Sequence, residues 1–303
     1  MNRIPGILKN RDAIFIFALA LGLSWDGGVA LGRHAIIPAL GLIMTLSLLD
    51  VSGDAFRSPR QAAITFFKGI GLSFGILTGF LLATSHIIIA DPDLRIGFIM
   101  AASVPPAIAI VPFTGIIGGD RSFSLLGVIG GFLAALFLTP SINLLFIGSD
   151  FIRISDILPI VIYLIVLPLV ISRIRFLSRI EKMRGTLINW VFFVVFYTMV
   201  GANRGVILHD PLFILPSIAI AFGSTFILGA AISFFCRRIG IKEGRTSSVV
   251  LLGTLKNYGL SAGLSLSLFG DRAAIPSAVL TVFLIGYFMW LSFIKRKGWG
   301  HFT

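Results

Sequence analysis

The chain has 303 residues, of which 56% are hydrophobic and only 13% are charged, and its mean hydropathy is +0.99. A water-soluble surface needs more polar residues than this, so the composition excludes an ordinary soluble protein and indicates an integral membrane protein. In a soluble protein, the net charge of +12 would suggest a nucleic-acid partner. We expect no nucleic acid here, because the basic residues gather in the loops of one membrane face.

Apolar segments recur along the whole chain at lengths that suit a bilayer. We expect an all-α membrane protein with ten transmembrane helices, at residues 12–31, 35–51, 61–90, 94–118, 122–147, 155–174, 186–202, 211–236, 246–269 and 272–294. An even number of helices places both termini on the same side of the membrane.

The distribution of Lys and Arg orients these helices. With the N-terminus in the cytoplasm, 19 of the 25 Lys and Arg residues lie in or beside cytoplasmic loops, and five lie on the opposite face. This asymmetry follows the positive-inside rule. It predicts a multi-pass protein of the inner membrane with both termini in the cytoplasm.

The ten helices divide near residue 150 into two halves of five, residues 1–150 and 151–303. Because five is odd, the second half enters the membrane from the opposite side, as in the inverted repeats of many secondary transporters. Pro105 and Pro106 interrupt the fourth helix, since proline removes a backbone donor and disfavours helix in the preceding residue. The polar stretch Gly253–Gly259 interrupts the ninth. Two broken helices at matching positions predict a binding site near the membrane midplane.

Lys256 lies at the centre of the interrupted ninth helix. An ammonium group in hydrocarbon costs several kcal/mol unless it faces protein, water or an opposite charge. We therefore interpret Lys256 as a functional residue.

Four short motifs follow one another along the chain. They are Pro-Pro-Ala-Ile-Ala-Ile-Val at 105–111, Gly-Gly-Asp-Arg at 118–121, Leu-Thr-Pro at 138–140 and Lys-Asn-Tyr-Gly-Leu at 256–260. In this order they resemble the bile acid:sodium symporter family, within the bile acid, arsenite and riboflavin transporter superfamily. The resemblance implies a divergent bacterial-type member, with a panel of helices 1, 2, 6 and 7 and a core of helices 3–5 and 8–10. It also implies that helices 4 and 9 cross at their unwound centres, beside a cleft for organic anions.

The sodium-coupled members of that family carry oxygen-bearing side chains at positions where this chain does not. The family has a Ser-Asn pair on helix 4, hydroxyls on helix 5, and a Glu and a Gln on helix 9. The corresponding residues here are Ile110, Val111, Val128, Ile129, Leu252 and Lys256. Aliphatic side chains do not bind a hard cation, so we expect the sodium site to be lost and transport to be sodium-independent. Asn257 keeps the family's identity.

Several roles are open to Lys256. Its ammonium group would occupy or exclude the place of sodium as an ion substitute, or burial would favour its neutral form and make it a proton carrier. The alternatives are a direct contact with an anionic solute and a structural lysine bonded to carbonyls. We expect an ion substitute or proton carrier.

The remaining substrate-binding candidates lie around the two interruptions. Unwound backbone exposes amides and carbonyls there, and the N-termini of half-helices favour anions. The candidates are Asn257, Pro105, Pro106, Ala107, Ile108, Ala109 and Thr114.

These features predict a secondary transporter of a small organic solute, an organic anion, that works by alternating access. Its partners would be the solute, the lipid bilayer and protons, and it would be a monomer or a weak homodimer. An alternative is an ion exchanger similar to sodium/proton antiporters, although no aspartate lies near the middle of a predicted helix. A second alternative is a non-transporting receptor of the same fold.

We expect no enzyme, because the sequence shows no nucleophile with a plausible base. The single cysteine and the four scattered histidines offer no metal cluster. We therefore also expect no metal and no cofactor.

Overall fold

The structure is a computed structural model of the chain. It describes residues 10–49, 58–148, 155, 159, 162–174, 183–202, 204–209 and 211–297. These residues are almost entirely helical and form no strand beyond an isolated bridge between Pro106 and Lys256. The prediction of an all-α protein is confirmed. The expected repeat boundary near residue 150 lies outside the described residues.

The chain divides into two compact units, each built from two separate stretches of sequence. The first comprises the described residues of Met1–Asp50 and Ile162–Ile214, and the second those of Val51–Val161 and Leu215–Thr303.

Helices α1 and α2 of the first unit both pack against α10. The elements of this unit are α1 (Arg11–Ser24), α2 (Val29–Leu48), η4 (Ile162–Val166), α9 (Leu167–Ile171), α10 (Arg184–Gly201) and α11 (Arg204–His209). Phe15 packs edge-on against Phe192 and Phe196, with ring centroids 5.9 and 5.0 Å away. The Tyr197 hydroxyl accepts a hydrogen bond from the Gly28 amide at 3.0 Å. Aromatic packing therefore joins α1 to α10, and a hydrogen bond fixes the turn between α1 and α2.

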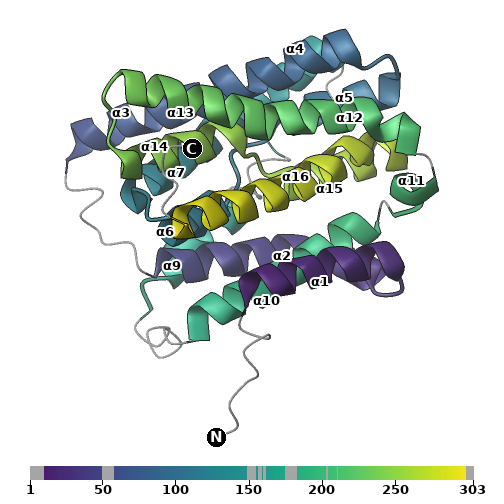
Figure 1. Cartoon of the computed structure of the whole chain (residues 1–303), viewed down its shortest axis with the longest axis horizontal. Helices are drawn as coiled ribbons and strands as arrows, with labels where there is room; N and C mark the ends of the chain where they lie inside the picture. Colours follow the sequence, from purple (N-terminus) through teal and green to yellow (C-terminus); the bar gives the residue numbers. More distant parts are fainter. Residues whose placement is uncertain are drawn as a thin grey trace, which may run out of the picture. The chain divides into compact units, whose positions relative to one another are not determined.

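The second unit contains the broken helices and the longest continuous helices. In its first part lie α3 (Pro59–Ile70), η3 (Gly71–Leu77), α4 (Thr78–Ile88), α5 (Pro92–Ser103), α6 (Ile110–Ile116) and α7 (Arg121–Ile147). In its second part lie most of α12 (Pro211–Phe222), then η6 (Gly223–Ile227), α13 (Leu228–Arg238), α14 (Glu243–Thr254), α15 (Tyr258–Phe269) and α16 (Asp271–Arg296). The π-helical turns η3 and η6 each sit inside a continuous helical rod, and α12 and α13 form one such rod in Figure 1.

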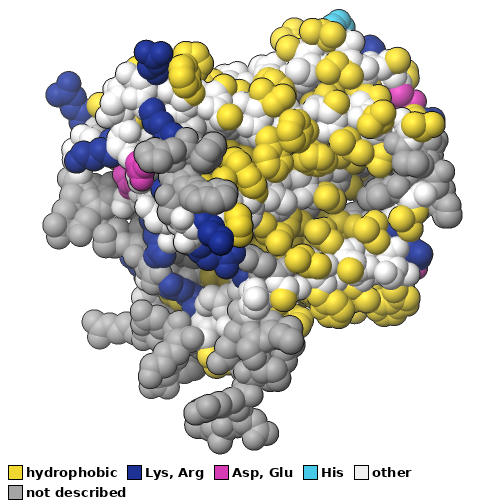
Figure 2. Space-filling model, viewed as in Figure 1, with side chains coloured by type: hydrophobic (Ala, Val, Ile, Leu, Met, Phe, Trp, Pro, Cys, Tyr) yellow, Lys and Arg dark blue, Asp and Glu magenta, His cyan; other side chains and the backbone are white. Residues whose placement is uncertain are grey.

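Five helical stretches of the described residues are long and apolar enough to cross a membrane. They are Pro59–Ile88, Arg121–Ile147, Arg184–Gly201, Leu212–Arg238 and Asp271–Arg296. Large apolar side chains on these stretches are exposed, including Phe67 at 74% and Phe137 at 64%. Hydrophobic side chains also cover the middle of α12 and α13 in Figure 2, with Lys and Arg gathered where α13 ends. Such a surface is stable in lipid and not in water.

Candidate functional site

Two helices of the second unit are interrupted where the sequence predicts a break. Helix α5 ends at Ser103, and Val104 takes an extended conformation with φ −68° and ψ 159°. The residue before a proline is driven out of the helical region by the proline ring, which explains this ending. The second break follows α14, where Leu255 is also extended, and helix resumes with α15 at Tyr258.

The two interruptions meet and satisfy each other's backbone groups. The Ala107 amide donates to the Leu255 carbonyl at 3.3 Å, and the Asn257 amide donates to the Pro105 carbonyl at 2.9 Å. Both bonds flank the bridge between Pro106 and Lys256, so neither bridging residue has to donate. This pattern explains why a proline is accepted at the centre of the crossing.

Helix α7 approaches the crossing closely. A Cβ atom at Gly131 would lie 2.5 Å from Cδ of Pro106, well inside van der Waals contact. Glycine is therefore required at position 131 for the helix to pass this near to the proline ring.

The side chain of Lys256 lies inside the crossing and is fully buried, with 0% exposure. Its Nζ donates a hydrogen bond to the Val104 carbonyl at 2.7 Å and lies 4.0 Å from the centroid of the Phe74 ring. No acidic side chain of the described residues forms an ion pair with it. The Lys256 amine is therefore stabilised by the Val104 carbonyl and the face of the Phe74 ring, and not by a carboxylate within the described part of the chain.

A second set of side chains bonds the end of α5. Thr139 Oγ1 donates to the Ser103 carbonyl at 2.7 Å, and Asn143 Nδ2 donates to Ser103 Oγ at 3.0 Å. The carbonyls of Ser103 and Val104, which the break leaves without helical partners, are thus bonded by Thr139 and Lys256. Thr139 belongs to the Leu-Thr-Pro motif, but none of Thr139, Asn143 and Phe74 was expected at the site, because only tertiary contact brings them to the break.

Asn257 begins α15 and retains unused hydrogen-bonding capacity. Its Oδ1 accepts from the Leu260 amide at 3.2 Å, which caps the helix. Its buried Nδ2 has no partner among the described residues, and the same holds for the buried Tyr258 hydroxyl. The two residues that follow Lys256 in the sequence thus each carry a buried polar group without a partner among the described residues.

The other candidate residues from the sequence have different environments. Pro105, Pro106 and Ala107 form the crossing itself. Ile108 and Ala109 are buried in the turn that leads into α6. Thr114 lies within α6, and its hydroxyl shares a hydrogen bond with Ser124 of α7 at 2.7 Å. The Thr114 side chain thus links two helices.

The positions expected from the sequence resemblance to replace sodium ligands hold apolar side chains. All five aliphatic residues are buried, on α6, α7 and α14: Ile110, Val111, Val128, Ile129 and Leu252. A Cβ atom at Gly127 would lie 2.7 Å from Cδ1 of Leu252, so Leu252 directly contacts α7. These side chains offer no oxygen to a cation.

Two ion pairs join helix starts in the second unit. Arg272, at the start of α16, pairs at 3.1 Å with Asp91, whose side chain caps α5. Arg245, at the start of α14, pairs at 3.3 Å with Asp120, whose side chain caps α7. Each pair therefore connects a broken helix to an unbroken helix from the other half of the sequence.

Two broken helices that meet at their interruptions are a feature of many secondary transporters. Residues 60–290 match the SBF-like CPA transporter family, which covers more than half of the chain. The chain belongs to this family, and the family assignment from the sequence motifs is confirmed. It is accordingly a multi-pass membrane transporter of the SBF type. No curated protein sequence matches the chain.

Proposed function

We propose that this protein is a secondary transporter of a small organic anion in which Lys256 takes the place of the coupling cation. The observation that carries the proposal is the 2.7 Å hydrogen bond from Lys256 Nζ to the Val104 carbonyl, within the crossing of the two broken helices. A bound sodium ion would organise such carbonyls through its positive charge. A tethered ammonium group supplies the same charge without a sodium gradient.

The aliphatic side chains near the helix crossing support the loss of sodium coupling. Leu252 lies in the last turn of α14, four residues before Lys256, and is fully buried against α7. An aliphatic side chain at this position removes the carboxylate that would hold a hard cation. In this proposal the lysine and the aliphatic residues both act against the binding of a sodium ion.

A proton carrier is the second role we keep for Lys256. Loss of its proton would remove the positive charge that strengthens the hydrogen bond to the Val104 carbonyl, and would loosen the crossing. The two roles differ in one measurable respect. A proton carrier makes the thermal stability of the wild type depend on pH in a way that Lys256→Gln abolishes, whereas a permanently charged substitute does not.

The unused donors support an anionic solute. Asn257 Nδ2 and the Tyr258 hydroxyl, on the two residues that follow Lys256, are buried without partners among the described residues. A carboxylate accepts several hydrogen bonds at once and would satisfy them. An ion exchanger is less well supported, because no carboxylate of the described residues adjoins Lys256.

We further propose ten transmembrane helices in an inverted repeat, with both termini in the cytoplasm. Two correspondences support this arrangement. The π-helical turns η3 and η6 interrupt the third rod of each half, and the pairs Asp91–Arg272 and Asp120–Arg245 connect helix starts across the halves. In this proposal the first compact unit is the panel and the second is the core that moves during alternating access.

The test uses purified full-length protein in detergent. Thermal unfolding is measured with a panel of carboxylates, each beside its neutral amide, for example benzoate with benzamide. A ligand that binds the folded state raises the unfolding midpoint. We expect at least one carboxylate to do so while its amide does not. Stabilisation by amides and carboxylates alike, or only by neutral solutes, would contradict an anion site.

A further inference from the structure

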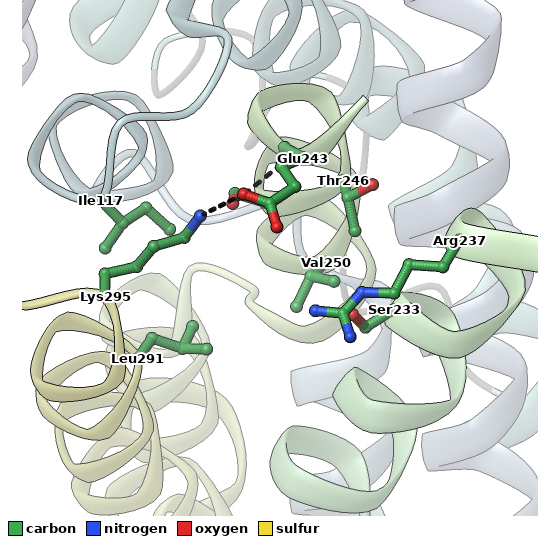
Figure 3. A pocket seen from close by; sticks show the side chains of 9 residues that line it. Ile117, Ser233, Arg237, Glu243, Thr246, Val250, Leu291 and Lys295 are labelled. Atoms are coloured by element: carbon green, nitrogen blue, oxygen red, sulfur yellow. Dashed lines mark hydrogen bonds and ion pairs between the residues drawn. The ribbon is translucent and has the colours of Figure 1, made fainter. Parts of the chain in front are cut away.

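A pocket of the second unit lies between α13, α14 and α16, away from the helix crossing. Its polar wall comprises Ser233 and Arg237 of α13, Glu243, Thr246 and Ser247 of α14, and Lys295 of α16. Its floor is apolar and is formed by Ile117, Val250 and Leu291. Figure 3 shows the Arg237 guanidinium and the Lys295 amine reaching toward the pocket from opposite sides.

The pocket is small and has a definite charge. Its volume of about 20 Å³ is only slightly more than the ~10–15 Å³ that one water molecule requires, so it can enclose an oxygen atom or two of a larger group but no whole solute. Two cations, Arg237 and Lys295, and one acid, Glu243, line it, and Glu243 pairs with Lys295 at 3.7 Å, so the lining carries one more positive charge than negative. The balance of charge therefore favours an anionic group.

One wall of the pocket carries a polar group without a partner. Ser233 is 2% exposed, and its Oγ has no hydrogen-bond partner among the described residues. Ser233 and Arg237 lie four residues apart on α13, so both side chains face the pocket from the same side of the helix. A buried hydroxyl beside a guanidinium is suited to an oxyanion such as phosphate.

The surroundings of the pocket indicate where the phosphate comes from. Phe234 and Phe235 of α13 are 55% and 65% exposed, and Phe293 of α16 is 46% exposed. These aromatic side chains adjoin the pocket residues in sequence, on helices that are apolar enough to cross a membrane. Further basic residues, Lys242, Arg296 and Lys297, lie where helices around the pocket begin or end. Basic residues at the ends of membrane helices attract anionic lipid headgroups.

We propose that this pocket binds the phosphate of an anionic phospholipid headgroup, with the acyl chains against the exposed phenylalanines. Arg237 and the Ser233 hydroxyl hold the phosphate oxygens, and Lys295, which pairs with Glu243, faces them from the opposite side of the pocket. The site is separate from the solute site and does not depend on the role of Lys256.

The test measures thermal unfolding of the delipidated full-length protein in detergent during titration with dioleoylphosphatidylglycerol. Parallel titrations use dioleoylglycerol, which lacks the phosphate, and potassium phosphate, which lacks the acyl chains. The variants are Arg237→Gln and Ser233→Ala. The matched control is Arg238→Gln, because Arg238 follows on the same helix, does not line the pocket, and lies over the Phe234 ring.

We expect the phospholipid to stabilise the wild type and Arg238→Gln, and dioleoylglycerol to have no effect. Half-maximal stabilisation should require about tenfold more lipid in Arg237→Gln, for a charge-assisted hydrogen bond, and about threefold more in Ser233→Ala, for a neutral one. Equal responses of Arg237→Gln and Arg238→Gln would overturn the proposal. Full stabilisation by potassium phosphate alone would assign the pocket to a free ion and overturn the lipid source. If Arg237→Gln does not fold, an unchanged titration of Ser233→Ala decides against the site.

Discussion

The amine of Lys256 and the carbonyl of Val104 are 152 residues apart in the sequence and 2.7 Å apart in the structure. The carbonyl is free because Pro105 ends α5, and the amine reaches it because α14 ends just before Lys256. The break after α5 thus provides the hydrogen-bond acceptor, and the break after α14 provides the donor. The lysine completes the crossing of the two helices from within.

Replacing Lys256 with methionine tests its role in holding the crossing. The variant keeps the length and apolar stem of the side chain but leaves the buried Val104 carbonyl without its donor. An unpaired buried acceptor costs about 1–3 kcal/mol, so we expect a lower unfolding midpoint, with Lys256→Gln between the variant and the wild type. Lys68→Met serves as the control, because Lys68 is exposed on α3. A methionine variant as stable as the wild type would show that the hydrogen bond does not hold the crossing.

The close contact between α7 and the crossing predicts that Gly131 cannot be replaced without loss of stability. Gly131→Ala places a Cβ atom 2.5 Å from Pro106, and the backbone of the bridge has to shift. We expect a loss of stability of about 1–3 kcal/mol, in the range of overpacked cores, together with loss of transport. Gly79→Ala is the matched control, since its Cβ would meet no described atom within 4 Å. Thermal unfolding that is equally unaffected in both variants would contradict the close approach of α7.

A substitution at Asn257 can separate helix capping from solute binding. Asn257→Asp keeps an oxygen that accepts from the Leu260 amide, so α15 should still be capped. The change removes the buried Nδ2 donor and adds a negative charge. We expect a folded variant that no longer responds to the stabilising carboxylate in the thermal assay. A variant that is folded and still stabilised by the carboxylate would place the anion elsewhere.

Asp120 has two contacts that two substitutions can separate. It caps α7 through the Phe123 amide at 2.9 Å and pairs with Arg245 at 3.3 Å. Asp120→Asn keeps the cap and loses an exposed ion pair, which contributes about 0–1 kcal/mol. Asp120→Ala also loses the cap, at a further cost of about 1 kcal/mol. Denaturant or thermal unfolding should therefore rank alanine below asparagine, and equal stability of the two would contradict the capping role.

The sequence predicted those features of the second unit that depend on local chemistry. Two adjacent prolines disfavour helix wherever they occur, so the break after Ser103 was predictable, and the polar stretch around Lys256 predicted the second break. The partners of these breaks were not predictable from local patterns. Phe74 and Arg272 look like ordinary residues of apolar helices or turns in the sequence, and Thr139 stands out only as part of the Leu-Thr-Pro motif. Only tertiary contact brings them to Lys256, Asp91 and Ser103, respectively.

The π-helical turns were also not predictable from local sequence patterns. Nothing in the composition of Gly71–Leu77 or Gly223–Ile227 distinguishes a π-turn from α-helix, because both have the same apolar pattern. Phe74 lies in the first of these turns, where it provides the aromatic face for Lys256. A widened helical turn at a functional site is a recognised use of the π-helix.

The most direct test of the account asks whether the wild type binds sodium. Thermal unfolding of the purified protein is measured in sodium chloride and in choline chloride at matched ionic strength. A bound ion stabilises the folded state by mass action, so sodium binding would raise the unfolding midpoint. We predict the same unfolding midpoint in both salts, because the Lys256 ammonium already occupies the crossing. A clearly higher midpoint in sodium would contradict this account, and Lys256 would then serve the anionic solute beside an intact sodium site.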